Sequence, residues 1–318
     1  MKDVVAGIDI GGTNIISGLV DKSGNILAEE RLKTAEFPDI KDYITAQHDA
    51  INKMLERNSG HRLVGLGVGA PNANYHKGTI ELAPNLSWKG IVPLARYLRE
   101  KIDVPVIVTN DANAAAMGEM IFGGAKGMKD FIVLTLGTGL GSGIVVNGEV
   151  VYGYTGFAGE LGHTIIVPGG RECGCGRRGC YETYASASGL VRTVLHLLSE
   201  MRADSTLRDL PPSELTSKKI VGEAEKGDRI ALEAINYTAE MLALGIINAI
   251  TFSSPEAVFL FGGLVNAGEL LLAPVRNYAD SNVMPIFRGR TRILPSAISE
   301  SNAAVLGAAA LAWNELKK

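Results

Sequence analysis

Two stretches of the chain share one pattern: an apolar strand, a glycine-rich turn, a second apolar strand and a second turn. The first is VVAGIDIGGTNIISGLVDKSGNILAEE at residues 4–30, and the second is FIVLTLGTGLGSGIVVNGEVVY at residues 131–152. Apolar runs bounded by glycine and asparagine turns predict paired strands. Because the same opening occurs twice, we expect two related structural units.

The glycine turns are candidate phosphate sites. A turn rich in Gly and Thr exposes backbone N–H groups that can bind phosphate oxygens. A third such turn, Gly262-Gly263, follows the apolar run at residues 257–261. When Gly11 is aligned with Gly137, Asp9 stands opposite Thr135, so only the first turn has an acid. No GxxxxGK[ST] pattern occurs, which excludes a P-loop.

Strands and helices alternate along the chain. Helical patterns at residues 43–56, 93–101, 229–251 and 302–315 alternate with apolar strands at residues 63–71, 104–108 and 257–261. This order predicts an α/β fold with mixed sheets. We expect an N-terminal lobe at residues 1–115, to which a C-terminal helix at about 302–318 returns, and a C-terminal lobe at residues 116–301.

Composition excludes several classes of protein. The 318 residues carry a net charge of -3, which argues against broad binding to nucleic acid. The longest uncharged helical run lies between Glu240 and Glu256 and is shorter than the roughly 20 residues that span a membrane. The start, MKDVVAGIDI, has no signal-peptide pattern. We therefore expect a cytoplasmic protein with no membrane or nucleic-acid partner.

The cysteines predict a metal site. Cys173, Cys175 and Cys180 lie in one glycine-rich segment, and His163 is the nearest histidine. Three thiolates and one imidazole complete a tetrahedral zinc site, which we expect to be structural because no coordination position stays open. The alternative is three buried free thiols. The flanking glycines and Arg177-Arg178 are unlike a core segment and favour zinc.

Longer motifs resemble known families. DIGGTN at 9–14 and LGTGLGSG at 136–143 resemble the paired phosphate loops of the actin, sugar-kinase and Hsp70 superfamily, and FGGLVNAG at 261–268 resembles its adenosine motif. GELGHTIIVPGGRECGCGRRGCYETYAS at 159–186 closely resembles the signature of the ROK (repressor, open reading frame, kinase) family. Together the motifs cover nearly the whole chain. The resemblance implies two duplicated actin-like, ribonuclease H-like lobes, with a zinc loop in the second.

The resemblance also implies an activity, the ATP-dependent phosphorylation of the primary hydroxyl of an aldohexose. Glucose is the expected substrate, and the resemblance implies a cytoplasmic homodimer. Asp111 matches the catalytic base of the family. From the residues alone, a catalytic role and a role as the N-cap of a helix are equally expected for Asp111. The sugar contacts that it implies are Asn85, Asn110, Asp111, Glu160, His163 and Glu182. The nucleotide contacts are Asp9, Gly11, Gly12, Thr13, Asn14, Gly137, Thr138, Gly139, Gly262 and Gly263, with Asp9 holding Mg²⁺, in part through water.

Other functions stay open. N-acetylmannosamine, N-acetylglucosamine and mannose are alternative substrates, and polyphosphate is an alternative donor. The family includes sugar-responsive repressors with a helix-turn-helix domain ahead of the first loop; that loop begins here at residue 9, which favours a kinase over a repressor. A non-catalytic sugar sensor remains an alternative, while the zinc signature disfavours an actin-like polymer. Asn72 stands where the family usually has glycine, and we expect it to affect sugar specificity.

Overall fold

The computed structural model describes residues 1–317, in two compact units. The first unit contains residues 1–128, residues 143–159 and the chain from Ser296 onward; the second contains residues 129–142 and 160–295. These units differ from the expected lobes, which divide the chain at residue 115 and place 143–159 in the second lobe. The segment 143–159 joins the first unit because Tyr152 stacks on Tyr75 with 3.8 Å between ring centroids.

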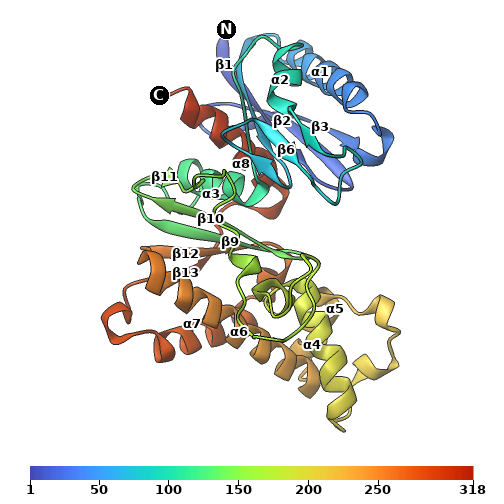
Figure 1. Cartoon of the computed structure of the whole chain (residues 1–318), viewed down its shortest axis with the longest axis vertical. Coiled ribbons are helices and arrows are strands. Elements are labelled where there is room, and N and C mark those ends of the chain that lie inside the picture. The colour runs from blue at the N-terminus through green and yellow to red at the C-terminus, as the bar shows by residue number, and fades with distance from the viewer. Residues whose placement is uncertain (318) are drawn as a thin grey trace. The chain divides into compact units, whose positions relative to one another are not determined.

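The first unit is built on a five-stranded mixed sheet with the strand order β3-β2-β1-β4-β8 (Figure 1). Its strands are β1 (Lys2–Ile10), β2 (Asn14–Val20), β3 (Ile26–Lys33), β4 (His61–Gly69) and β8 (Val106–Thr109). The first three pair antiparallel, and β4 and β8 run parallel to β1. A small separate sheet contains β5 (Ala73–Asn74), β6 (Thr79–Glu81) and β7 (Ile91–Val92).

A second five-stranded sheet repeats this arrangement, in the order β11-β10-β9-β12-β13. Its strands are β9 (Phe131–Leu136), β10 (Leu140–Val146), β11 (Glu149–Val150), β12 (Ala257–Phe261) and β13 (Arg292–Pro295). As in the first sheet, a meander is followed by two parallel strands. The α/β fold with mixed sheets is therefore confirmed.

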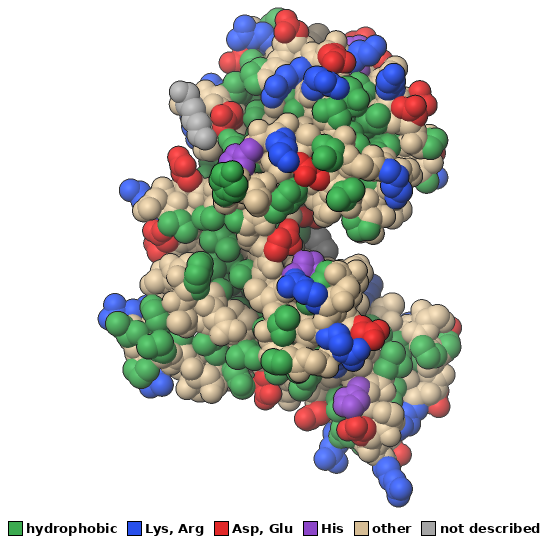
Figure 2. Space-filling view, viewed as in Figure 1, with side chains coloured by type: hydrophobic (Ala, Val, Ile, Leu, Met, Phe, Trp, Pro, Cys, Tyr) green, Lys and Arg blue, Asp and Glu red, His purple; other side chains and the backbone are tan. Residues whose placement is uncertain are grey.

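The helices lie between and after the strands. In the first unit they are α1 (Ile40–Arg57), α2 (Leu94–Arg99), α3 (Asp111–Ile121) and α8 (Glu300–Glu315). In the second they are α4 (Ala187–Glu200), α5 (Ser217–Glu225), α6 (Arg229–Ser253) and α7 (Glu269–Asn282). The last residue of the expected C-terminal helix, 318, lies outside the described residues. On the face that Figure 2 shows, basic and acidic side chains are interspersed, in keeping with the small net charge.

The helix α6 is long and apolar enough to cross a membrane by length and composition, and 56% of its most apolar window is buried inside the protein. The helix predicted at residues 229–251 is confirmed, and it is longer than the uncharged run from Glu240 to Glu256 because α6 also includes charged residues near its start. Helices that are apolar nearly all round also occur in the cores of large globular proteins. The burial of α6 fits this second description.

A row of glycines crosses the first sheet beneath α8. Gly7 of β1 is paired with Gly18 of β2 on one side and with Gly67 of β4 on the other. A Cβ on Gly7 or Gly67 would collide with a backbone carbonyl oxygen of α8. On Gly18 it would lie 2.6 Å from a methyl carbon of Val305. The missing side chains therefore let the alanine-rich helix lie directly on the sheet.

The same close packing continues from α8 to α3. Gly118 of α3 lies against Gly307 of α8, where an added Cβ would be 3.1 Å from the Gly307 Cα. Because α3 begins at Asp111, its contact with α8 determines where that carboxylate lies relative to the sheet. The opposite face of the sheet packs on α1 through a larger apolar core that includes Ile8 and Val68.

We predict that Gly67→Ala destabilises the protein by about 2–3 kcal/mol or more, because the new Cβ collides with the Ala308 carbonyl. Gly60→Ala is the matched control, since no atom lies within 4 Å of a Cβ at that exposed turn. Urea unfolding of the two variants checks the prediction. Equal stability of both variants would show that α8 does not rest on the glycine row.

Candidate functional site

The first unit holds two carboxylates at the ends of β1 and β8, two strands of the sheet that are separated by β4. Asp9 is the second-to-last residue of β1. Asp111 begins α3, just beyond the end of β8. Gly69 ends β4, the strand between them. A Cβ on Gly69 would lie 3.7 Å from Asp9 Oδ1 and 3.7 Å from Asp111 Cα. Glycine at this position therefore leaves the space between the two acids open.

The capping role belongs to Asn110. Its Oδ1 accepts a hydrogen bond from the Asn113 N–H at 2.9 Å, which is the usual contact of a helix N-cap. Asp111 Oδ1 accepts a bond from the Ala112 N–H at 2.8 Å, and the side chain remains accessible to solvent. The structure thus separates two roles that the sequence alone left together, and the Asp111 carboxylate is not needed as the cap.

Both carboxyl groups are weak acids. Burial, with a smaller contribution from the charge of Asp111, raises the pKa of Asp9 to about 7. The Asp111 side chain is accessible, yet the protein atoms around it limit its hydration, and this desolvation raises its pKa. Perturbed carboxyls that lie close together are typical of functional sites.

The first glycine turn, Gly11–Asn14, lies close to the predicted sugar residue Asn85. Gly11 N–H donates to the Asn14 carbonyl at 2.9 Å, and the Thr34 hydroxyl donates to the Gly11 carbonyl at 2.7 Å. A Cβ on Gly12 would lie 3.1 Å from the Asn85 carbonyl oxygen. The structure therefore brings the first predicted phosphate loop and an exposed predicted sugar contact together.

The second glycine turn lies in the second unit, against Glu182. A Cβ on Gly139 would lie 2.6 Å from Glu182 Oε2, so a side chain there would displace this carboxylate from its present position. The Ser188 hydroxyl holds the turn by donating to the Thr138 carbonyl at 2.6 Å. The third turn is adjacent, because Gly262, with φ +106°, packs on the backbone of Leu136 at the end of β9.

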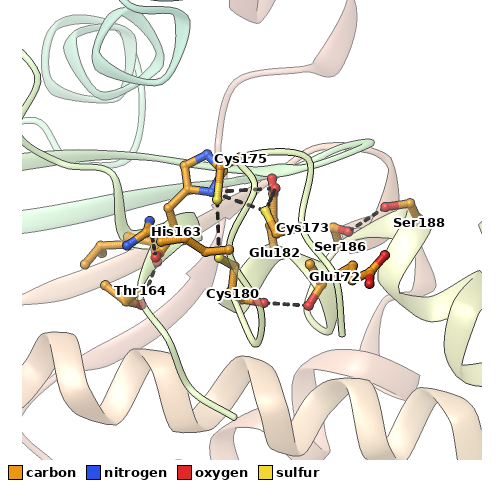
Figure 3. A network of polar contacts seen from close by, with 12 residues as sticks. His163, Thr164, Glu172, Cys173, Cys175, Cys180, Glu182, Ser186 and Ser188 are labelled. Atoms are coloured by element: carbon orange, nitrogen blue, oxygen red, sulfur yellow. Dashed lines mark hydrogen bonds and ion pairs between the residues drawn. The ribbon is translucent and has the colours of Figure 1, made fainter. Parts of the chain in front are cut away.

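The four predicted metal ligands come together in the second unit. The ligand atoms of His163, Cys173, Cys175 and Cys180 all lie within 4.8 Å of one another (Figure 3). Two of the pairs are 3.6 Å apart, namely His163 Nδ1 with Cys173 Sγ and Cys175 Sγ with Cys180 Sγ. Three sulfurs and one nitrogen at these separations fit a single tetrahedral zinc ion.

Glu182 connects this cluster to the second glycine turn (Figure 3). Its Oε1 accepts a hydrogen bond from Cys173 Sγ at 3.0 Å and lies 3.6 Å from His163 Nδ1. Its other oxygen faces Gly139. Glu160 precedes the short helix Leu161–His163, and its carbonyl accepts the His163 N–H at 3.1 Å. The three predicted sugar contacts of the second unit therefore belong to one connected group.

Arg171 holds the cysteine loop in place, and the sequence analysis did not single it out. Its Nη1 donates to the Thr183 and Gly189 carbonyls at 2.8 and 3.1 Å, and its guanidinium lies 4.5 Å from the centre of the Tyr184 ring. No carboxylate pairs with it in the part of the chain that the structure describes. One signal was present, an arginine two residues before Cys173, but arginine in a loop is too common to be informative alone.

Asn72, the departure from the family pattern, has a left-handed backbone with φ +51°. Among residues other than glycine, asparagine is one of the few that adopt this conformation readily. Its side-chain amide donates to the Leu82 carbonyl at 3.3 Å. Asparagine can therefore adopt the left-handed conformation of this turn, and its effect on sugar specificity stays a prediction.

Comparisons with known proteins identify the family of this chain. The model of the ROK family matches residues 5–315. The chain belongs to the ROK family. A glucokinase of Streptomyces coelicolor is 38% identical over 281 residues, 85% of each chain. A xylose repressor of Caldicellulosiruptor bescii is 33% identical over 86% of this chain and 70% of its own length.

Among solved structures, a ROK family glucokinase from Streptomyces griseus in complex with glucose and AMPPNP has a TM-score of 0.80 and 33% identity, over 98% of this chain and 99% of that one. The family predicted from the motifs is therefore confirmed. The glucokinases among the relatives support a sugar kinase, and xylose repressors are also similar to this chain.

We predict that Asp9→Asn raises the stability of the protein at pH 8, in the absence of nucleotide and magnesium, by on the order of 2–4 kcal/mol. The folded pKa of about 7 lies above the unfolded value of 3.8, so folding disfavours the carboxylate, and the free energy of unfolding falls as pH rises from about 4 to about 7. Asparagine removes this cost.

Thermal unfolding of wild type and variant from pH 4 to pH 8 measures the effect. The difference should be much smaller at pH 4, where the wild-type carboxyl is protonated in the folded state and only partly ionised in the unfolded state, whose pKa is 3.8. A difference that does not change with pH would contradict the raised pKa of Asp9.

Proposed function

We propose that the protein is an ATP-dependent hexose kinase that phosphorylates the primary hydroxyl of glucose, and that it acts as a cytoplasmic homodimer with duplicated, actin-like lobes. The observation that carries the proposal is the accessible carboxyl of Asp111, with its raised pKa, beside Asp9 and the first glycine turn. Likeness to a glucokinase whose structure contains glucose and AMPPNP supports the choice of substrate and donor.

Asp111 would act as the general base. The hydroxyl oxygen of the sugar attacks the γ-phosphorus of ATP, the bond from that phosphorus to the bridging oxygen breaks, and ADP leaves. The hydroxyl proton passes to the Asp111 carboxylate. A raised pKa suits this role, because a base with a pKa nearer the working pH accepts a proton more readily. Since Asn110 provides the helix cap, the base is left available for substrate.

The nucleotide would be held mainly by backbone. Gly11–Asn14 and Gly137–Gly139 present N–H groups to phosphate oxygens, and Gly262 and Gly263 contact the adenosine. Phosphoryl transfer depends mainly on such positioning and on neutralising charge. Mg²⁺, bound with the help of Asp9, would neutralise phosphate charge. Asp9 precedes the first glycine turn and Thr135 stands at the aligned position before the second, so the first turn supplies the carboxylate that the metal requires.

The sugar hydroxyls would be recognised by the polar side chains of Asn85, Asn110, Glu160, His163 and Glu182. A carboxylate accepts hydrogen bonds from two neighbouring hydroxyls, which suits Glu160 and Glu182. Zinc bound by His163 and the three cysteines would be structural and would orient the imidazole, whose second nitrogen remains available to a hydroxyl.

We predict sugar-dependent ADP release from Mg-ATP, largest with glucose in a panel of glucose, mannose, N-acetylmannosamine and N-acetylglucosamine. Asp111→Asn should lower kcat about 100-fold or more, because it removes the proton acceptor, and should leave glucose binding within a few-fold of wild type. Asp103→Asn, an exposed acid in the loop before β8, is the matched control and should keep full activity.

The same assay decides between an enzyme and a sensor, the alternative that the xylose repressor relatives favour. Binding of a sugar without turnover, with ATP and with polyphosphate as donor, would support the sensor and refute the kinase. Near-normal turnover of Asp111→Asn would refute only the assignment of the base. A larger signal with N-acetylmannosamine would keep the kinase and change its substrate.

We also predict about one zinc ion per chain. His163→Asn should lower zinc content and thermal stability, because it removes one of the four clustered ligands. His196→Asn is the control, since that histidine is exposed on α4 and pairs with Glu200 at 3.7 Å. Elemental analysis of the purified proteins gives the content. Wild-type protein that is free of metal, stable and active would contradict a structural zinc site.

A further inference from the structure

A cavity lies in the first unit, along the free edge of its sheet. Its volume is about 390 Å³, and its floor is the backbone of β8, which is the edge strand. Neither Asp9 nor Asp111 lines it. Cavities of this size accommodate small metabolites. The residues that line the cavity are therefore distinct from the pair of carboxylates Asp9 and Asp111.

The charged groups of this edge cavity are mainly basic. Lys77, Arg96 and Arg99 line it, and Glu315 is its one acid. Glu315 accepts a hydrogen bond from the Tyr75 hydroxyl at 3.2 Å, and so has a partner on the wall already. An excess of cations around an open cavity favours an anionic ligand.

Arg99 is the best placed of the three cations. Its Nη2 donates to the Val106 carbonyl at 2.8 Å, which holds the guanidinium over the strand edge, and no carboxylate pairs with it in the described part of the chain. Lys77 pairs with Glu81 at 3.1 Å, and Arg96 lies 3.8 Å from Glu100. Exposed ion pairs of this kind are weak, so both cations are able to exchange a carboxylate for a bound anion.

The segment Tyr75–Gly78, which lines the cavity, is held by contacts with its neighbours. Tyr75 stacks on Tyr152, with 3.8 Å between centroids and 2° between ring planes. His76 Nε2 contacts the Gly153 carbonyl at 2.8 Å. Gly78, with φ +64°, packs so closely on Ala95 that an added Cβ would lie 2.7 Å from the alanine methyl carbon. Because these contacts are present without ligand, little ordering is needed when an anion binds.

We propose that the edge cavity binds a small phosphorylated metabolite with two anionic groups, such as a sugar bisphosphate. The planar fork of Arg99 matches two oxygens of one phosphate, and Lys77 and Arg96 lie at the same cavity for a second anionic group. This site does not depend on the proposed kinase activity, because it shares no residue with it.

Calorimetric titration with fructose 1,6-bisphosphate tests the proposal, in the presence of saturating glucose and AMPPNP so that the proposed active site is occupied. We expect saturable binding, weakened at least tenfold in Arg99→Ala and severalfold in Lys77→Ala. Arg99→Lys, which keeps the charge and loses the fork, should be intermediate. Arg57→Ala is the control, since Arg57 lies on α1, is exposed, and pairs with Glu30 at 3.0 Å.

Several results would overturn the proposal. They are the absence of binding to wild type, full affinity in both Arg99→Ala and Lys77→Ala, or an equal loss in Arg57→Ala, which would indicate general charge attraction. Circular dichroism shows whether each variant is folded. Should Arg99→Ala fail to fold, because the bond to Val106 is lost, Lys77→Ala makes no such backbone contact and gives the result by itself.

Discussion

The contact between α8 and the glycine row of β1, β2 and β4 is the constraint on which the first unit depends. A helix approaches a sheet this closely only where side chains are missing on the sheet and small on the helix, and both conditions hold here. The position of α8 then determines that of α3, through the contact of Gly307 with Gly118. Since Asp111 is the first residue of α3, the helix α8 near the C-terminus positions the carboxylate of a residue that lies far away in the sequence. Backbone packing far from any ligand thus decides the geometry of the acid pair.

In the second unit, one side chain connects two features that are separate in the sequence. Glu182 contacts Gly139 of the glycine turn with one oxygen, and Cys173 with the other. Arg171 holds the loop through carbonyl oxygens and the Tyr184 ring, and no carboxylate among the described residues pairs with it. Contacts within the protein therefore determine the shape of the cysteine loop. They bring the ligand atoms of His163 and the three cysteines close together. A change in this loop would reach the glycine turn through Glu182.

Kinases and repressors share this family domain, so the fold alone does not distinguish them. The two carboxyls of the first unit carry more weight. Burial that raises the pKa of Asp9 to about 7 means that its charge is unfavourable in the folded protein at neutral pH. Apolar or amide side chains would make the same unit more stable. Residues that lower stability in this way are expected where they serve binding or chemistry, and this supports the kinase over a protein that only senses sugar.

Local patterns in the sequence determined much of this protein: the repeated strand–turn–strand openings, the alternation that predicts an α/β fold, the family motifs and the set of His163 with three cysteines. Turn chemistry, periodicity and ligand spacing are properties of short segments, so they can be found without the fold. Only the tertiary structure decided that Asn110 caps α3 while Asp111 stays available, that residues 143–159 pack with the first unit, and that Arg171 and Arg99 have defined partners. Those outcomes depend on contacts between segments that are distant in the sequence, or on which of two adjacent side chains faces a helix end. No short pattern encodes them, because they follow from how closely whole helices and strands pack.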